Sequence, residues 1–490
     1  MSNKDDRGLV SDEPLMPIIG CGEGHAIGRN DWPMPDQIPS ILPRGDIPSL
    51  VWPPVHSHQT ATLAASILQL EATQWLSAEE IAAGQRAQLG NLATYFHAQS
   101  NWFRNRIAKA GLTPEDIAQP GGLKKLPPIT RREAQAEFAT QPTHFLPEGH
   151  GPVSQVNTSG STGEPVIVWK TAISQLDWLS VTMRYYRWGN LDFTGRLAAI
   201  RALMKRDGEY PDWGAPMSQF GRTGPMIAIK IATDVDRQID MLRAYQPDRL
   251  IIYPSNLDTL TTALEARGET LPTIRNIWTL GETLHAATRE RTKDFWGLAL
   301  FDTYTSEEFG YIAVQCPTGG LYHTVDEMLI VEVVDQTGAP CPPGTVGRVL
   351  VTDLRNHATP LFRFEIGDYA QAAEPCACGR GLGTLKRIMG RERNMIRNPD
   401  GTRYWPMTGY KRYREIAPIL QYQIIQHSLE RLEMRLVTER ALSKAEEASL
   451  RAHLRTIFTF QFAIDFTYHQ GRLPTGPNGK FEEFVSKIGT

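Results

Sequence analysis

The stretch Asn157-Thr-Ser-Gly-Ser-Thr-Gly-Glu-Pro165 combines two glycines with small hydroxyl side chains, a composition suited to binding an anion. Glycine lets backbone N–H groups converge on one point, and serine and threonine add donors without bulk. The apolar runs Val153–Val156 and Val166–Trp169 predict strands on both sides, which disfavours an interdomain linker. No lysine follows Gly163, so the P-loop of nucleoside triphosphatases is disfavoured. Taken alone, the stretch leaves a phosphate loop and a structural hairpin turn equally open.

Apolar runs downstream of this loop alternate with helical patterns from about residue 150 to 370. Arg249–Tyr253 predicts a buried strand, Ser255 is expected to cap a helix that runs to about Arg267, and Ile274–Leu280 predicts another strand. Such strand–helix–strand order is typical of parallel sheets covered by helices. We therefore expect an α/β fold whose large N-terminal domain holds mostly parallel sheets and helices.

The last hundred residues have a different pattern. Gln421–His427, Leu432–Thr438 and Phe462–Tyr468 alternate like strands with one exposed face, and Ser443 with Glu446 has the spacing of a capping box. This order predicts a small α+β domain that can move relative to the large one.

The predicted organisation has three parts. Residues 1–58 are rich in proline, glycine and aspartate and are expected to form an extended arm, residues 59–389 the large domain, and residues 390–490 the small domain. The boundary is placed near Gly390-Arg391.

The composition excludes several classes of protein. The 490 residues carry a formal net charge of −3, so nothing points to nucleic acid or an anionic membrane. The sequence predicts no transmembrane segment, and its charged start predicts no secretory signal. Five cysteines in a chain of this length disfavour a disulfide framework, and we expect a cytoplasmic protein.

Motifs downstream of the loop give it a context. The stretch Thr158-Ser-Gly-Ser-Thr-Gly-Glu-Pro165 resembles the phosphate loop of the adenylate-forming enzymes, a superfamily of acyl- and aryl-coenzyme A ligases, adenylation domains and luciferases. Other motifs of that superfamily follow in the same order: Gly281-Glu282 on the adenine side, Tyr304-Thr-Ser-Glu-Glu308 at the magnesium motif, Pro360-Leu-Phe-Arg-Phe-Glu-Ile-Gly-Asp368 at the ribose, Gly390-Arg-Glu-Arg393 at the hinge and Pro474-Thr-Gly-Pro-Asn-Gly-Lys480 at the lysine loop.

Within the superfamily the sequence resembles the phenylacetate–coenzyme A ligase branch. The stretches that carry this resemblance are Tyr-Gln-Pro-Asp…Tyr-Pro-Ser at 245–255, Gly-Tyr-Ile-Ala-Val-Gln-Cys after Glu308 and Cys-Ala-Cys-Gly-Arg-Gly-Leu before the hinge. The resemblance implies an AMP-forming acid–thiol ligase that uses ATP and Mg²⁺. A carboxylate would attack the α-phosphorus of ATP to give an acyl-adenylate and pyrophosphate, and coenzyme A would then displace AMP. Transfer of the same adenylate to an amine or to a carrier-protein thiol is the alternative.

The resemblance also implies residue roles. Glu308 would hold Mg²⁺, Asp368 would accept from the ribose hydroxyls, and Lys480 and Arg391 would be catalytic contacts to phosphate or ribose. The nucleotide-binding residues would be Thr158, Ser159, Gly160, Ser161, Thr162, Gly163, Gly281, Glu282 and Tyr304. The structural alternatives are a helix-start acid at Glu308, a turn at Gly367-Asp368 and a solvated loop lysine at Lys480.

Two positions depart from the family pattern. Glu307 stands where threonine or serine is usual, and Arg393 stands at the hinge pivot, where aspartate or lysine is usual. These departures keep open a non-catalytic nucleotide-binding protein, whereas the intact Glu308, Asp368 and Lys480 argue for an enzyme.

A second set of residues could bind a metal. Cys316, His323, Cys376 and Cys378 would supply a closed tetrahedral site for structural Zn²⁺, which some members of the resembled branch carry in these regions. Two buried cysteines and an exposed pair are the alternative. Cys21 and Cys341 have no partner pattern and are interpreted as structural.

The acid substrate is the least defined part of the prediction. Its pocket is expected beside Gly281-Glu282 and Tyr304, with walls formed by Tyr253, Pro254, Ser255 and Thr279. The resemblance to this family favours an aryl or arylacetic acid over a long aliphatic acid as the substrate. A monomer and a homodimer both stay open.

Overall fold

Helices near the beginning of the chain follow the capping signals of the sequence. The structure, a computed structural model, describes residues 42–43, 45, 47, 50, 55–140, 143, 145–158, 165–189, 191–202, 204, 206–318, 320–406, 410–474 and 481–488. Ser77 accepts from the N–H of Glu80 and donates its own N–H to the Glu80 carboxylate, which makes a capping box. The first helices are α1 (His58–Thr73), α2 (Ala78–Gln99), α3 (Asn101–Lys109), α4 (Pro114–Ala118), α5 (Gly122–Lys125) and α6 (Arg131–Glu137).

The predicted strand–helix–strand segment forms the parallel half of a 12-stranded sheet. Strands β7, β4, β8, β9 and β10 lie side by side in that order and are parallel, and β5 adds an antiparallel edge. The elements of this half are β4 (Leu197–Arg201), β5 (Gly208–Tyr210), α8 (Met217–Phe220), β6 (Gly221–Arg222), β7 (Met226–Lys230), α9 (Val235–Tyr245), β8 (Arg249–Ile252), α10 (Pro254–Arg267), β9 (Asn276–Thr279), α11 (Ala286–Trp296) and β10 (Leu300–Ser306). The short β1 (Leu42–Pro43), within the predicted arm, pairs with β6.

The other half of the sheet is antiparallel. Strand β11 pairs antiparallel with β10, and β12 lies between β11 and β16 and is antiparallel to both. The strands are β11 (Gly310–Gln315), β12 (Tyr322–Thr324), β13 (Leu329–Val334), β14 (Val346–Asp353), β15 (Phe364–Ala372) and β16 (Thr384–Arg391). The α/β class is confirmed, but the sheet is mixed rather than mostly parallel, because loops without crossover helices connect these later strands.

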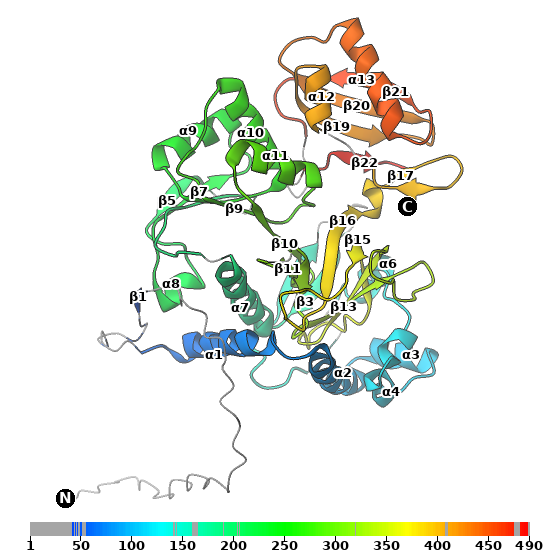
Figure 1. The fold of residues 1–490 in the computed structure, drawn as a ribbon. Coiled ribbons are helices and arrows are strands. Elements are labelled where there is room, and N and C mark those ends of the chain that lie inside the picture. Colours follow the sequence, from blue (N-terminus) through cyan, green and yellow to red (C-terminus); the bar gives the residue numbers. More distant parts are fainter. Residues whose placement is uncertain are drawn as a thin grey trace, which may run out of the picture. The chain divides into compact units, whose positions relative to one another are not determined.

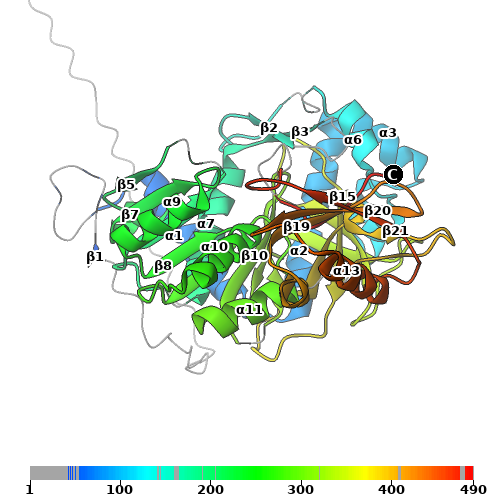
Figure 2. The same cartoon turned by 90° about the horizontal axis from the view of Figure 1, so that it is seen from above.

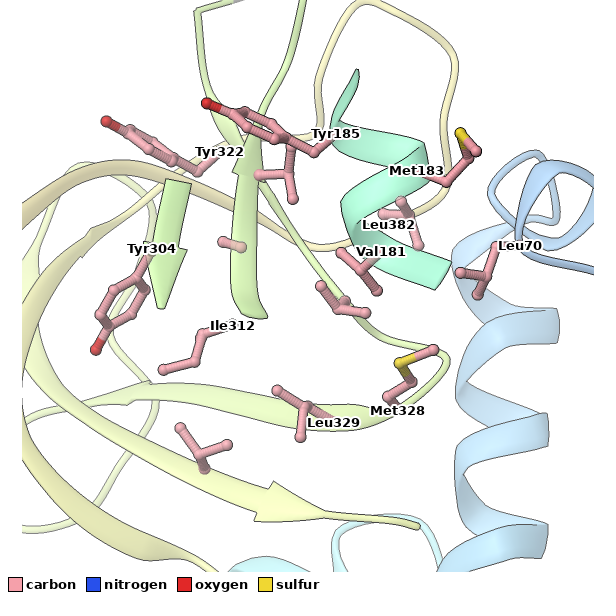
Figure 3. Close-up of a cluster of buried hydrophobic side chains, with 14 of the residues drawn as sticks. Leu70, Val181, Met183, Tyr185, Tyr304, Ile312, Tyr322, Met328, Leu329 and Leu382 are labelled. Atoms are coloured by element: carbon pink, nitrogen blue, oxygen red, sulfur yellow. The ribbon is translucent and has the colours of Figure 1, made fainter. Parts of the chain in front are cut away.

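The two faces of the parallel half are buried under different helices (Figures 1 and 2). One face packs with α9, α10 and α11. The other packs with α1 and with α7 (Ala172–Trp188). Figure 3 shows Val181 and Tyr185 of α7 among Ile312 and Leu329 of the neighbouring strands, while the hydroxyl of Tyr304 points away from this cluster.

A separate two-stranded sheet carries the predicted phosphate loop. Strands β2 (Ser154–Thr158) and β3 (Val166–Lys170) pair antiparallel, so the loop between them is flanked by strands as the apolar runs predict. Ser255 is not a helix cap: α10 begins at Pro254 with Tyr253 as its N-cap, because proline suits the first helical position.

The C-terminal residues have their own core, built from Ile396 to Phe484. Ser443 and Glu446 form the predicted capping box at the start of α13. The elements are the 3-10 turn η1 (Glu392–Asn394), β17 (Ile396–Arg397), β18 (Arg403–Tyr404), α12 (Tyr410–Ile416), β19 (Ile419–Gln426), β20 (Arg431–Thr438), α13 (Lys444–Ile457), β21 (Ala463–Tyr468) and β22 (Phe484–Ser486). Residues 41–490 form one compact unit, and the proposed boundary near Gly390 stays a prediction.

Candidate active site and metal cluster

A tyrosine, an aspartate and an arginine meet where β10 and β15 approach each other. The hydroxyl of Tyr304 donates to Oδ2 of Asp368 at 2.7 Å, and Nε of Arg391 lies 3.3 Å from Oδ1 of the same carboxylate. Asp368 and Arg391 are register partners on β15 and β16. Burial and the Asp368 charge raise the pKa of Tyr304, so its hydroxyl stays a donor. The predicted ribose acid is therefore held by two donors in an almost buried position.

Glu308 lies in the turn between β10 and β11 and is 2% exposed, so the helix-start alternative for this residue is wrong. Its Oε1 lies 3.8 Å from Nη1 of Arg131, the first residue of α6. A single buried carboxylate suits Mg²⁺, which takes one or two protein carboxylates and completes its shell with water and phosphate.

The turn that carries Glu308 is also held by a lysine. Nζ of Lys170, the last residue of β3, donates to the carbonyl of Glu307 at 2.7 Å. Burial lowers the pKa of Lys170, and the charges of Asp353 and Glu308 oppose that shift. The hairpin of the predicted phosphate loop is thus bonded directly to the predicted magnesium turn.

The predicted adenine-side motif lies at the end of β9. Gly281 has a φ of 75°, which glycine adopts without strain. One carboxylate oxygen of Glu282 accepts from the N–H of Ser255 at 3.0 Å, and the other accepts from the N–H of Phe481 at 3.1 Å. Phe481 follows Lys480 in the sequence. Glu282 therefore joins the first turn of α10 to the C-terminal lysine segment.

The predicted hinge begins where only glycine fits. Gly390 has a φ of 97°, and a Cβ there would lie 3.1 Å from Oγ1 of Thr283. Asn394 accepts from the N–H of Arg391 and donates to the carbonyl of Phe484 at 2.8 Å, so it ties the hinge to β22.

Several predicted residues lie outside the described residues. These are Ser159, Gly160, Ser161, Thr162 and Gly163 of the phosphate loop, Lys480, and Cys21, together with the side chains of Thr158 and Arg393. Their roles stay predictions.

The four proposed zinc ligands come together. The ligand atoms of Cys316, His323, Cys376 and Cys378 all lie within 4.8 Å of one another. Sγ of Cys316 is 3.7 Å from Sγ of Cys376, and Sγ of Cys378 is 3.3 Å from Nε2 of His323. A tetrahedral ion with Zn–S bonds of about 2.3 Å places two sulfurs roughly 3.8 Å apart, so the spacing fits zinc. Among the described cysteines, including Cys341, none forms a disulfide.

The metal-facing imidazole is oriented by its other nitrogen. Nδ1 of His323 lies 3.4 Å from the carbonyl of Leu382, the kind of contact that fixes the tautomer of a metal ligand. Burial lowers the pKa of His323 to about 4, so Nε2 is available as a neutral ligand. The interpretation as two buried cysteines and an exposed pair does not describe this geometry, because one histidine and three thiols converge.

The predicted walls of the acid pocket lie along the carboxyl ends of β8 and β9. Tyr253 accepts from the N–H of Ala202 at 3.4 Å, and Thr279 donates to Asp302 at 2.6 Å. A separate cavity of about 320 Å³ lies between β2, α7 and β11 and is lined by Trp178 and Tyr311 among others. None of the four predicted wall residues lines it, so their role stays a prediction.

Comparison with known proteins agrees with this geometry. Over 349 residues the chain is 24% identical to the phenylacetate-coenzyme A ligase of Escherichia coli (strain K12), covering 67% of this chain and 75% of the relative. This chain is similar to phenylacetate-coenzyme A ligases. It is also 25% identical over 337 residues to the phenylacetate-coenzyme A ligase of Thermus thermophilus, covering 66% of this chain and 72% of the relative. No family model matches it.

A solved structure shares the fold of this chain. A 2-hydroxyisobutyryl-coenzyme A ligase in the postadenylation state superposes with a TM-score of 0.66 at 15% identity, covering 85% of this chain and 91% of that one. The predicted resemblance to adenylate-forming enzymes is confirmed. Among the described helices, none is long and apolar enough to cross a membrane.

Sequence reasoning missed several residues of the site. Arg131 and Lys170 contact the magnesium turn, and Arg472 donates to Oδ1 of Asn256 at 2.6 Å beside the Glu282 junction. No local pattern marks them, since each pairs with a partner far away in the sequence. Only Lys170 offered a signal, because it directly follows the predicted strand Val166–Trp169 that leaves the loop.

Proposed function

We propose that this protein activates a carboxylic acid with ATP to an acyl-adenylate and transfers the acyl group to coenzyme A, releasing AMP. The observation that carries the proposal is the carboxylate of Asp368, held by Tyr304 and Arg391 close to the buried Glu308. The arrangement offers an acceptor for ribose hydroxyls and a metal-binding carboxylate at one sheet edge. The similarity to phenylacetate-coenzyme A ligases supports the same reaction class.

Residue roles follow from the chemistry of the first step. Attack on the α-phosphorus builds negative charge on the phosphates, and Mg²⁺ bound through Glu308 would neutralise part of it. Asp368 orients the ribose. Arg391 combines a contact to Asp368 with a place at the predicted hinge, so it can hold the nucleotide while the C-terminal part moves. Its pKa is lowered by burial but raised more by Asp368 and Glu308, so it remains a cation.

Lys480 and the loop from Thr158 to Gly163 complete the proposed machinery. The loop would hold the β- and γ-phosphates of the leaving pyrophosphate, and the lysine would supply positive charge to the bridging region. The residues from 390 onward would then carry the catalytic lysine on a mobile domain. The backbone bond from Phe481 to Glu282 supports a place for the lysine segment beside the adenine-side motif.

The cysteine–histidine cluster has a structural role in this proposal. Zn²⁺ on Cys316, His323, Cys376 and Cys378 would fasten the segments after β11 and before β16 to each other. Those segments flank the strands that carry Glu308 and Asp368, so the ion would brace the site without touching substrate.

Pyrophosphate release tests the function. The protein is incubated with Mg-ATP and a panel of aryl and aliphatic acids, with and without coenzyme A. We expect release with at least one acid and formation of a thioester only when coenzyme A is present. Pyrophosphate release that depends on an amine instead of coenzyme A would support amide synthesis in place of thioester formation. Absence of release with every acid, with and without each acceptor, would overturn it.

A further inference from the structure

Two basic side chains stand at the carboxyl ends of neighbouring parallel strands. Arg201 ends β4 and Lys230 ends β7, and the two residues are register partners. Along β4, Leu197 and Ala199 belong to the core shared with α1 and α7, whereas Ala198 and Ile200 belong to the core under α9 and α10. Since side chains alternate along a strand, Arg201 faces the α7 side. The same alternation places Lys230 on that face.

The charge of Arg201 acts on two buried tyrosines of α7 and β11. Burial raises the pKa of Tyr186 and of Tyr311, and the positive charge of Arg201 opposes the rise at both hydroxyls. Nε of Arg201 is buried without a hydrogen-bond partner. Within the part of the chain that the structure describes, no carboxylate forms an ion pair with Arg201 or with Lys230.

Asp207, the acid nearest to Arg201 in the sequence, is already engaged. Asp207 accepts from the backbone N–H of Lys230 at 2.8 Å and from the hydroxyl of Thr233 at 3.0 and 3.1 Å. A part-buried cation without a counterion is costly, and such groups are usually paired. No carboxylate among the described residues therefore serves as counterion to this cationic pair, which leaves it able to receive an external anion.

The strand register connects the cationic pair to the predicted acid pocket. Ala199, Ile251, Trp278 and Phe301 are successive register partners across β4, β8, β9 and β10, and all four pack on the α7 side. Two residues further along each strand, the same face carries Arg201, Tyr253, Leu280 and Thr303. Neighbouring strands lie about 4.8 Å apart, so β4 is roughly 10 Å from β9 and roughly 14 Å from β10. Arg201 thus lies at the far end of the row from Thr303, the residue before Tyr304.

We propose that the acid substrate carries a second anionic group, which Arg201 binds together with Lys230. In this proposal the carboxylate to be activated lies at the ends of β9 and β10. Because the arginine side chain extends from β4 toward these strands, the two acidic groups of the substrate are separated by up to roughly 10 Å. The rings of Tyr186 and Tyr311 favour an aromatic spacer. This substrate class rests on the proposed function, because it assigns the far end of the predicted acid pocket.

Matched acids test the inference. Phenylacetate is compared with 4-carboxyphenylacetate and 4-sulfophenylacetate, and hexanoate with adipate, by pyrophosphate release in the wild type, Arg201→Gln and Arg201→Lys. The exposed Arg237 of α9 provides a control variant, Arg237→Gln. We expect the wild type to prefer the doubly acidic member of a pair. Arg201→Gln should lower kcat/KM for that member by about 10- to 100-fold, the value of a hydrogen bond between charged groups, and leave the monoacid within about threefold. Arg201→Lys should retain part of the preference, and Arg237→Gln all of it.

The outcomes separate the two proposals. Turnover of monoacids with no preference for a second charge, unchanged in Arg201→Gln, would overturn the inference and leave the ligase function intact. If no acid releases pyrophosphate, binding is measured by thermal shift without ATP. Stabilisation by the doubly acidic compounds that disappears in Arg201→Gln would then support the inference while the ligase function fails, and no such stabilisation would overturn both. Melting temperatures of the apo variants exclude misfolding as the cause.

Discussion

The Asp368 carboxylate offers the sharpest test of the nucleotide site. It accepts from Tyr304 at 2.7 Å and contacts Arg391 at 3.3 Å, which leaves lone pairs for two ribose hydroxyls. A hydrogen bond to a charged group contributes about 1.5–3 kcal/mol. Asp368→Asn removes the charge and replaces one acceptor by a donor, so one to two such bonds to ATP are lost. We expect a loss of about 2–4 kcal/mol, or roughly 30- to 1,000-fold in kcat/KM for ATP.

Tyr304→Phe is the matched control, because it removes one donor to Asp368 and keeps the charge. Its effect on kcat/KM for ATP should stay below about tenfold, although the variant should lose about 1–2 kcal/mol of folding stability through the lost buried hydrogen bond. Initial rates of pyrophosphate release are measured with ATP varied at saturating acid and then with acid varied at saturating ATP. A normal KM for ATP in Asp368→Asn would refute the ribose assignment. The assignment would also be refuted if the activity lost in both variants followed their melting temperatures and did not depend on the ATP concentration.

Three further predictions follow from the geometry. Lys480→Ala should suppress pyrophosphate release by at least about 100-fold while a supplied acyl-adenylate still reacts with coenzyme A, and equal loss of both steps, measured by thioester formation, would contradict the assigned role. Purified protein should contain about one zinc per chain by elemental analysis, and Cys378→Ser should lower both metal content and melting temperature, whereas a metal-free preparation of unchanged melting temperature would contradict the site. Burial raises the pKa of Asp302 to about 6, although hydrogen bonds from Thr279 and Tyr322 oppose the shift. Folding therefore favours the protonated carboxyl group. The contribution of Asp302 to stability is full below about pH 4 and is lost as the pH rises through about 6. In urea unfolding, the free energy of unfolding of Asp302→Asn should rise relative to that of the wild type by up to about 3 kcal/mol between about pH 4 and pH 6. A difference between the two proteins that does not depend on pH would refute the prediction.

Local chemistry made much of the fold predictable. The capping boxes at Ser77 and Ser443 mark real helix starts, because a side chain that bonds its own first turn needs no tertiary context. The run Arg249–Tyr253 marks β8, since a strand buried on both faces is apolar throughout. The predicted cap at Ser255 was wrong by two residues, because Pro254 takes the first helical position and Tyr253 becomes the N-cap.

Pairing between distant strands was not predictable in the same way. The metal cluster forms because β12 pairs with β16, which brings His323 opposite Thr384 and close to the cysteines at 376 and 378. No periodicity within either segment specifies that partner. The contact from Arg131 to Glu308 depends likewise on how α6 packs, so motif order located the acid but not the base that faces it.

The double role of Glu282 has a consequence for turnover. Its bond to the lysine segment runs to the backbone N–H of Phe481, so any residue at that position other than proline can form it, and mutation of the side chain would leave it in place. One charge-assisted bond of about 1.5–3 kcal/mol, taken alone, leaves the segment detached for roughly 1–10% of the time. In the proposed mechanism, such a bond would favour docking during the first chemical step and would still be weak enough to break in every cycle. The same carboxylate also holds the start of α10, so it stays oriented while the segment is away and is ready to receive it again.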